Sequence, residues 1–228
     1  MIQLPILAQG TSWIVINKPV GVSVHNDPQD VCALLRQQLK PGTFEDLFLV
    51  HRLDKETSGV LILALNSKAA KELAEQFQSK TCEKIYTAIL RGTLKISDKT
   101  SSEWESWTKP ISDKAEGRKN PQGASKDRIS ARTDYRLIKS SQYLSMIEVK
   151  LFTGRQHQIR KHSAMDNHSI VGDSRYGDSK YNSRMSDIYG TDRMFLHARS
   201  LKIFIEGSEH LFEAPIPKEF FKVFEEIS

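Results

Sequence analysis

The chain has 228 residues, of which 39% are hydrophobic and 27% charged, and this balance excludes wholesale disorder and suits one sizeable globular domain. Its 33 basic and 28 acidic residues give a formal net charge of +5, which fits a polyanionic partner but does not by itself indicate one. There is no apolar run long enough for a transmembrane helix, no signal-peptide pattern and no zinc-type cysteine spacing, so we expect a cytoplasmic protein whose two cysteines are reduced.

The first 94 residues are predicted to alternate between strands and helices. Segments with apolar side chains at every second position predict strands, and two segments with apolar residues three and four positions apart predict helices. The predicted elements are a strand, a turn and a second strand at 12–25, a helix at 29–39 that Pro41-Gly42 ends, a short apolar run at 47–50, a strand at 60–65, a helix from the N-cap Ser67 to about Ser79 and a strand at 84–94.

Residues 95–130 contain two prolines, two glycines and few aliphatic side chains, so we expect a long excursion or loose hairpin there. The elements predicted beyond it are strands at 131–138 and 143–152, a helix at about 154–165 with a capping box of Thr153 and Gln156, a loop at 170–177, strands at 194–205 and 210–213 and a helix from Pro217. This order predicts a single α+β domain over residues 1–228, with a mixed, mostly antiparallel central sheet and flanking helices.

The tetrapeptide His-Arg-Leu-Asp at 51–54 follows a short apolar run and precedes a strand that leaves at Gly59. A carboxylate at such a turn is held by backbone on both sides, and Arg52 can place positive charge nearby without lying against Asp54. A solvated surface turn is the alternative, and the tetrapeptide alone favours that alternative.

Residues 153–162 place polar and cationic side chains at the start of a predicted helix, where N–H groups and positive charge favour an anion. That anion is a catalytic carboxylate, an RNA phosphate or both, and Arg160 lies one turn beyond Gln156, where it can reach a buried Asp. A basic, solvated helix end is the alternative. The two histidines here have no third ligand partner and are expected to be hydrogen-bonded rather than metal-bound. Tyr86 lies in a predicted strand in which apolar residues alternate. Its side chain faces either a pocket or the core, and the residue taken alone favours the core.

Taken together and in order, six segments resemble the RluA-type family of RNA pseudouridine synthases. The resemblance runs from about Trp13 to Pro217, and its most specific parts are HRLD followed by SG, and TGR-x-HQIR. The six segments are KPVGVSVH (18–25), HRLDKETSGVLILA (51–64), KIYTAILRG (84–92), LFTGRQHQIRKH (151–162), IVGDSRYG (170–177) and FLHARSL (195–201).

The resemblance implies a pseudouridine synthase fold with a central RNA-binding cleft and an enzyme that needs neither cofactor nor metal. It implies that Asp54 is the catalytic aspartate, that Tyr86 is the active-site tyrosine and that a basic residue pairs with the carboxylate. We favour Arg160 for that pairing, with Arg155 as the alternative. The residues expected to contact RNA are Arg52, His51, Arg155, Gln156, His157 and Lys161.

The chemistry of pseudouridine formation explains these residue types. The N1–C1′ bond breaks, uracil rotates and C5 joins C1′, so the base must leave its stack and the cavity must be filled. A planar cation such as Arg52 can fill it. Asp54 attacks the ribose, attacks the base or takes the C2′ proton, and the sequence leaves all three routes open. Arg160 would keep Asp54 ionised, and Tyr86 can stack on uracil and relay the C5 proton.

Three features of the sequence differ from the family pattern. Residues 167–170 read Asn-His-Ser-Ile where the family commonly has Gly-His-Pro-Ile, which predicts a local loop change. Residues 109–128 carry six Lys/Arg against three acids, and we expect them to grip RNA, with a solvated loop as the alternative. Because the first predicted strand begins by Ser12, we expect no N-terminal S4-type domain.

The substrate is therefore expected to be structured RNA, either tRNA or ribosomal RNA, bound by a monomer without an obligatory protein partner or a membrane. A non-catalytic RNA-binding protein on the same fold is the main alternative. A hydrolase that uses Asp54 with His51 is a second, which neither a nucleophile elbow nor a metal triad supports.

Overall fold

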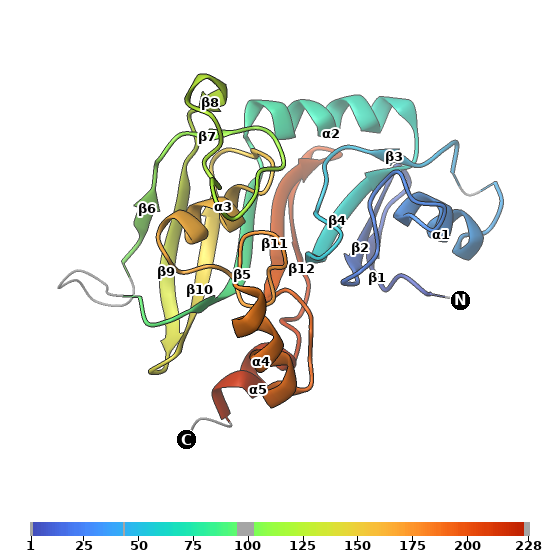
Figure 1. Cartoon of the computed structure of the whole chain (residues 1–228). Coiled ribbons are helices and arrows are strands. Elements are labelled where there is room, and N and C mark those ends of the chain that lie inside the picture. The colour runs from blue at the N-terminus through green and yellow to red at the C-terminus, as the bar shows by residue number, and fades with distance from the viewer. Residues whose placement is uncertain (1, 43, 95–102, 226–228) are drawn as a thin grey trace. The chain divides into compact units, whose positions relative to one another are not determined.

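The computed structural model describes residues 2–42, 44–94 and 103–225 (Figure 1). Its backbone contacts group into a first unit, Met1–Lys84 with His197–Pro215, and a second unit, Ile85–Leu196 with Ile216–Ser228. The expected mixed α+β architecture with mostly antiparallel strands is confirmed. Among the described helices, none has the length and apolar character needed to cross a bilayer.

The sheet of the first unit has the strand order β1-β2-β4-β11, with β3 added to β4 and β12 to β11. The β4–β11 pair is parallel and the other pairs of this sheet are antiparallel. The elements are β1 (Ile6–Gln9), β2 (Trp13–Lys18), α1 (Val31–Gln38), β3 (Phe48–Leu49), β4 (Ser58–Ala64), α2 (Ser67–Ser79), β11 (Leu196–Ile205, whose first residue belongs to the second unit) and β12 (Ser208–Glu213).

The core of the first unit follows from the period of its strands. Every residue of β4 is buried, as expected of a central strand covered on both faces. Alternate side chains point to opposite faces, so Val60 and Ile62 share one face and pack with Leu73 of α2 and Phe212 of β12. Each fully buried aliphatic side chain stabilises the unit by about 1.5–3 kcal/mol.

Two predictions for the first unit need correction. The cap of α2 is Asn66, whose side chain accepts a hydrogen bond from the Ala69 N–H, and the helix begins at Ser67. The second strand expected within 12–25 does not form, because the fully buried ammonium group of Lys18 bonds the carbonyl oxygens of Pro19 and Val22 at 2.9 and 2.8 Å. These bonds fold the segment after β2 into turns.

The sheet of the second unit has the order β5-β10-β9-β6 and is antiparallel in every described pair. The elements are β5 (Glu83–Arg91, whose first two residues belong to the first unit), β6 (Glu105–Trp107), β7 (Ile111–Ser112), a 3-10 turn (Ser125–Asp127), β8 (Arg128–Ile129), β9 (Thr133–Ser140), β10 (Leu144–Leu151), α3 (Gln158–Met165), α4 (Ser179–Tyr189) and α5 (Glu219–Glu225). Helix α3 lies against β9 (Figure 1).

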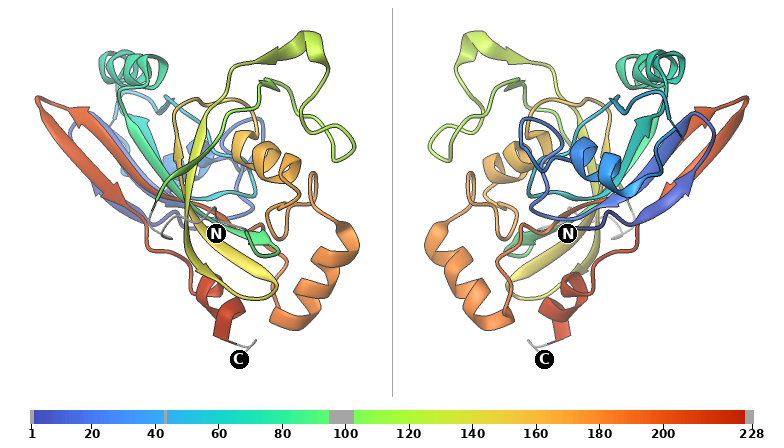
Figure 2. Two further views of the ribbon diagram at one scale, coloured as in Figure 1. Left: turned by 90° about the vertical axis from the view of Figure 1, so that its left-hand side faces the viewer. Right: turned by 90° about the vertical axis from the view of Figure 1, so that its right-hand side faces the viewer.

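The expected excursion at 95–130 is partly described, since residues 95–102 lie outside the described ranges. The remainder contains β6 and a two-stranded hairpin of β7 and β8, which we call the excursion hairpin, residues 110–129. Figure 2 shows this hairpin extending past the sheet of the second unit on the side of α3.

The start of α3 differs from the prediction. The capping box of Thr153 and Gln156 is wrong, because the helix begins later, at Gln158, after His157 in a left-handed conformation with φ 56°. The Thr153 hydroxyl instead lies 2.6 Å from the Gln158 side-chain oxygen. Helix α4 was not predicted, although Asp178 caps its start and Gly190 ends it.

Candidate active site

The segment from His51 to Ser58, which we call the aspartate loop, is fixed at its beginning by His51. The Nε2 atom of His51 accepts a hydrogen bond from the Ile62 N–H at 3.0 Å. Its ring stacks on Phe77 of α2 at a centroid distance of 4.3 Å and an interplanar angle of 14°. These contacts favour a structural role for His51 over the expected contact with RNA.

A second histidine holds the end of the aspartate loop. Ser58 Oγ lies 2.9 Å from His197 Nδ1, and His197 Nε2 lies 3.4 Å from the carbonyl oxygen of Ala214. His197 therefore links the side chain of Ser58 to the backbone of Ala214. Gly59 follows at φ +116°, where a Cβ atom would overlap the Ala198 carbonyl group, so only glycine allows β4 to lie this close to β11.

The middle of the aspartate loop is held through its backbone. The carbonyl oxygen of Lys55 accepts hydrogen bonds from Lys18 Nζ at 3.2 Å and from the Gly21 N–H at 2.9 Å. The Asp54 carbonyl oxygen accepts from the Thr57 N–H at 3.0 Å. The loop is therefore tied down before, within and after Asp54.

The side chains of the loop alternate between solvent and protein. Arg52 is exposed, Leu53 is buried with 5% of its surface accessible, and Asp54 is half-buried. Leu53 therefore anchors the loop while the cation and the carboxylate on either side of it stay accessible to a ligand.

His51 is neutral at physiological pH. Burial, and secondarily the positive charge of Lys84, lower the pKa of His51 to about 3. A neutral ring is also what the geometry requires, since an imidazolium has no lone pair with which to accept the Ile62 N–H.

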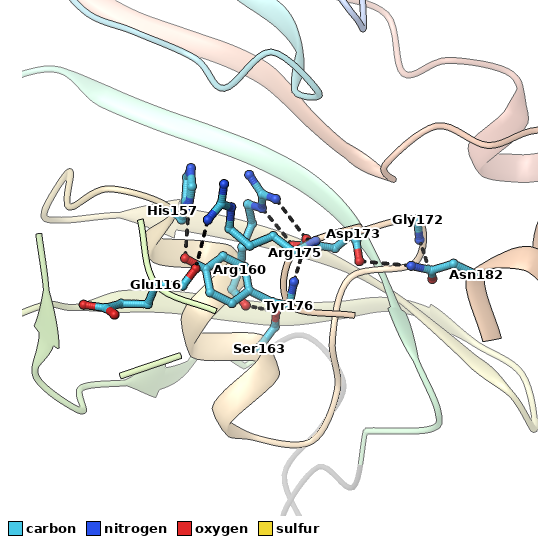
Figure 3. Close-up of polar contacts among 9 residues, drawn as sticks. All are labelled: Glu116, His157, Arg160, Ser163, Gly172, Asp173, Arg175, Tyr176 and Asn182. Carbon is cyan, nitrogen blue, oxygen red and sulfur yellow. Dashed lines mark hydrogen bonds and ion pairs between the residues drawn. The ribbon is translucent and has the colours of Figure 1, made fainter. Parts of the chain in front are cut away.

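In the second unit, Arg160 and Asp173 form a buried ion pair (Figure 3). Arg160 Nε donates to Asp173 Oδ2 at 2.8 Å and Nη2 donates to Oδ1 at 2.9 Å. The two side chains are only 3% and 0% exposed. Such a two-point contact fixes the plane of the guanidinium group as well as its position.

The turn that carries Asp173 is built to hold a carboxylate. Asp173 Oδ1 also accepts from the N–H groups of Arg175 and Tyr176 at 2.9 and 3.0 Å. The side chain of Asn182, on α4, donates to the Asp173 carbonyl at 3.0 Å and accepts from the Gly172 N–H at 3.0 Å (Figure 3). The unpredicted helix α4 thus supports the partner of Arg160.

The electrostatics of this cluster keep Asp173 ionised and Tyr176 protonated. Burial alone would raise the pKa of Asp173, but the hydrogen bonds and charge of Arg160 outweigh it and hold that pKa below its ordinary value. Burial raises the pKa of Tyr176 to about 12, against the opposing charges of Arg160 and Arg175. The Tyr176 ring lies 5.4 Å from the Arg160 guanidinium carbon, and its hydroxyl lies 3.0 Å from His157 Nδ1.

The other predicted site residues of the second unit are placed as follows. Tyr86 is buried on β5, opposite Val149 of β10. Arg155 lies 3.8 Å from the carboxylate of Asp113, and the Gln156 N–H donates to that carboxylate at 2.7 Å. The roles expected for these side chains stay predictions.

Lys161 does not fit its expected contact with RNA. It is fully buried, and its ammonium group donates to the carbonyl oxygens of Ser112 and Lys114 at 2.8 and 2.7 Å. The charge of Lys161 is therefore enclosed by the excursion hairpin, where a phosphate cannot reach it.

Sequence reasoning gave no role to several residues that organise these two sites. Each of them lies in one of the six segments that resemble the family, so the sequence match included these positions. The match does not show which side chains contact one another, so it could not assign their roles. These residues are Lys18, Ser58, Asp173, Tyr176 and His197.

Comparisons with known proteins agree with the resemblance. The family model described as RNA pseudouridylate synthase matches residues 12–165. A protein named tRNA pseudouridine synthase C from Haemophilus ducreyi is 35% identical over 209 residues, covering 87% of this chain and 84% of that protein. The protein of the same name from Haemophilus influenzae is 34% identical, covering 87% and 86% of the two chains.

A solved structure gives the same result. Human RNA Pseudouridylate Synthase Domain Containing 4 superimposes with a TM-score of 0.78 at 26% identity, over 97% of this chain and 92% of that one. The chain belongs to the RNA pseudouridylate synthase family.

Membership of this family gives the chain its activity. The synthase isomerises uridine to pseudouridine, its substrate is RNA, and the findings support this enzyme over the non-catalytic alternative. Among the described residues, no group of three or more His, Cys, Asp or Glu side chains is arranged to hold a metal ion.

The neutral state of His51 makes a prediction about stability. The pKa of His51 in the folded protein is about 3, below the ordinary value of 6.5. Between these two pH values the ring binds a proton in the unfolded chain but stays neutral in the folded protein. The contribution of His51 to the free energy of unfolding is therefore fully present above pH 6.5 and decreases as the pH falls toward 3. His51→Gln should flatten the pH dependence of the unfolding free energy in this window by up to about 1.4 kcal/mol per pH unit.

Chemical denaturation at a series of pH values between 4 and 7 measures this effect. His210→Gln, at a partly exposed histidine of the same unit, corrects for the general loss of an imidazole. An unchanged slope in His51→Gln would mean that the ring titrates as readily when folded as when unfolded.

Proposed function

We propose that this synthase modifies a uridine in tRNA, with Asp54 as its catalytic carboxylate. The observation that carries the assignment of Asp54 is the aspartate loop, in which backbone bonds, Leu53 and two histidines hold the backbone on both sides of a half-buried carboxylate. The tRNA assignment rests on the relatives named tRNA pseudouridine synthase C, which match most of this chain.

Asp54 acts on a uridine that has left its stack. The N1–C1′ bond breaks, the uracil turns, the C5–C1′ bond forms, C5 loses its proton and N1 ends protonated, so no atom is gained or lost overall. Asp54 begins the reaction by attacking the ribose, by attacking the base or by taking the C2′ proton. Arg52, exposed beside it, fills the space that the flipped base leaves.

Arg160 and Tyr86 assist Asp54 in this proposal. The Arg160 guanidinium pairs with the catalytic carboxylate, and Asp173 supports that role because it holds the guanidinium in one plane. Tyr86 stacks on the uracil and relays the C5 proton. Arg155, Gln156 and His157, around the start of α3, contact the RNA backbone.

The remaining expectations extend this proposal. The two units act as one catalytic domain, and the enzyme works as a cytoplasmic monomer without a cofactor. The exposed cations of the excursion hairpin, among them Lys119 and Lys126, grip RNA phosphates.

The catalytic assignment is tested by tritium release from RNA labelled at uridine C5, with separate tRNA and ribosomal RNA pools. Asp54→Asn should lower the rate by about 10³-fold or more, because a neutral amide cannot act as base or nucleophile. Asp46→Asn is the matched control, since Asp46 is an exposed acid of the same unit paired with Arg36. The proposal predicts release from the tRNA pool.

Two results would contradict these assignments. Full activity of folded Asp54→Asn would remove Asp54 from the chemistry, and release from ribosomal RNA alone would overturn the proposed substrate class.

The RNA grip of the excursion hairpin is tested by Lys119→Ala and Lys126→Ala. Each should raise KM for tRNA about two- to five-fold with little change in kcat, and should make binding less dependent on salt because one fewer counterion is released. Ser125→Ala, an exposed neutral residue beside Lys126, is the control. If KM and the salt dependence of both lysine variants match those of the control, the hairpin does not grip RNA.

A further inference from the structure

Lys161 of α3 is enclosed by the excursion hairpin. Besides the carbonyl oxygens of Ser112 and Lys114, its ammonium group lies 3.4 Å from the Ser112 hydroxyl, and both Lys161 and Ser112 are 0% exposed. A buried ammonium group without hydrogen-bond acceptors is strongly destabilising, so the burial of Lys161 depends on these acceptors. The side chain therefore fastens the hairpin to the helix.

The hairpin is folded tightly at the point where Lys161 holds it. The Ser112 N–H donates to the Gln122 carbonyl at 2.9 Å, and the Ser112 hydroxyl donates to the Glu116 carboxylate at 2.7 Å. Gly123 adopts φ +84°, and a Cβ atom there would overlap both Ser112 and Glu116. Arg128 closes the turn by donating twice to the Gly123 carbonyl. Several hydrogen bonds thus hold this part of the excursion hairpin in place, whereas the sequence predicts a long excursion or loose hairpin.

The excursion hairpin also contacts residues that lie around Arg160. The Tyr176 hydroxyl contacts His157 Nδ1 (Figure 3), and a backbone hydrogen bond from Glu116 acts to lower the pKa of that hydroxyl. The Glu116 carbonyl accepts from Arg175 Nη1 at 3.2 Å. Since the Tyr176 ring lies against the guanidinium of Arg160, the hairpin helps to set the surface on which Arg160 rests.

Polar contacts at the edge of the hairpin also join it to α4 and to the segment before α3. Arg118 of the hairpin pairs with Asp178, the residue that caps α4, at 2.5 Å. Asp113 accepts from the Gln156 N–H at 2.7 Å. Arg118 and Asp113 are exposed and Asp178 is partly exposed, so each of these contacts contributes little, and the loss of the buried Lys161 should matter most.

We propose that the excursion hairpin is a positioning element for Arg160 and that Lys161 is the positioning residue that fastens it there. The inference rests on the catalytic role proposed for Arg160. It assigns two separate effects to one hairpin: the exposed cations act on RNA affinity, and the part docked on α3 acts on the rate of isomerisation.

The test compares Lys161→Met with Tyr176→Phe in steady-state tritium-release assays on tRNA. Methionine keeps the length of the side chain but cannot bond the Ser112 and Lys114 carbonyls, and phenylalanine removes only the hydroxyl that meets Glu116 and His157. Each should lower kcat about ten-fold or more while KM stays within about two-fold, the pattern expected when a group is displaced in the transition state rather than in binding. Lys68→Met, at an exposed lysine of α2, is the matched control.

Arg160→Gln, alone and combined with Lys161→Met, separates failure of the inference from failure of the proposed function. If Arg160→Gln retains normal activity, the proposed role of Arg160 is wrong. If Arg160→Gln is inactive but Lys161→Met and Tyr176→Phe match the control, the inference alone is overturned. If Arg160→Gln retains measurable activity, adding Lys161→Met to it should cause little further loss, because both changes act on one group.

A change in KM alone in Lys161→Met would also overturn the inference, because it would make the hairpin an RNA-binding arm without a positioning role. If Lys161→Met fails to fold, as judged by circular dichroism and thermal unfolding, Tyr176→Phe decides the question, since it leaves the fastening in place.

Discussion

The ion pair between Arg160 and Asp173 is the interaction around which the second unit is organised. Both partners are almost completely inaccessible to water, so removal of either would leave a buried charge without its counterion, at a cost of about 3–5 kcal/mol. The surrounding structure supplies what such a pair needs: backbone N–H groups bond Asp173, Tyr176 covers the guanidinium and α4 braces the turn. The pair fixes a cation at one position and in one plane, which is the property that the proposed chemistry requires.

The first unit fixes its functional loop by a different physical means. The aspartate loop is held by two histidine side chains and by carbonyl groups to which a buried lysine and a glycine N–H donate. Lys18 and Lys161 have similar structural roles. The buried ammonium group of each donates hydrogen bonds to several backbone carbonyl oxygens and so fixes the conformation of that backbone segment.

The sequence predicted the architecture better than it predicted the contacts. The strands β4, β9 and β10 and the helices α1 and α2 were recognisable because apolar periodicity is a local property. The turn after β2 and the start of α3 were mispredicted, because a buried lysine and the bond between Thr153 and Gln158 override local propensity. Asp173 lay in a recognised segment, but its pairing with Arg160 depends on how the turn that carries Asp173 packs against α3. For the same reason Lys161, one residue beyond Arg160, was taken for an RNA contact.

The measurement that tests this account most directly is the rate of pseudouridine formation by Asp173→Asn. The substitution keeps the shape of the side chain but removes the charge that holds Arg160, and Asp187→Asn, at an exposed acid of α4, serves as the control. The account predicts that the folded Asp173→Asn protein binds RNA normally and loses about 10²-fold or more in kcat, because a misplaced cation no longer supports the transition state. A folded variant with the rate of the control would contradict it.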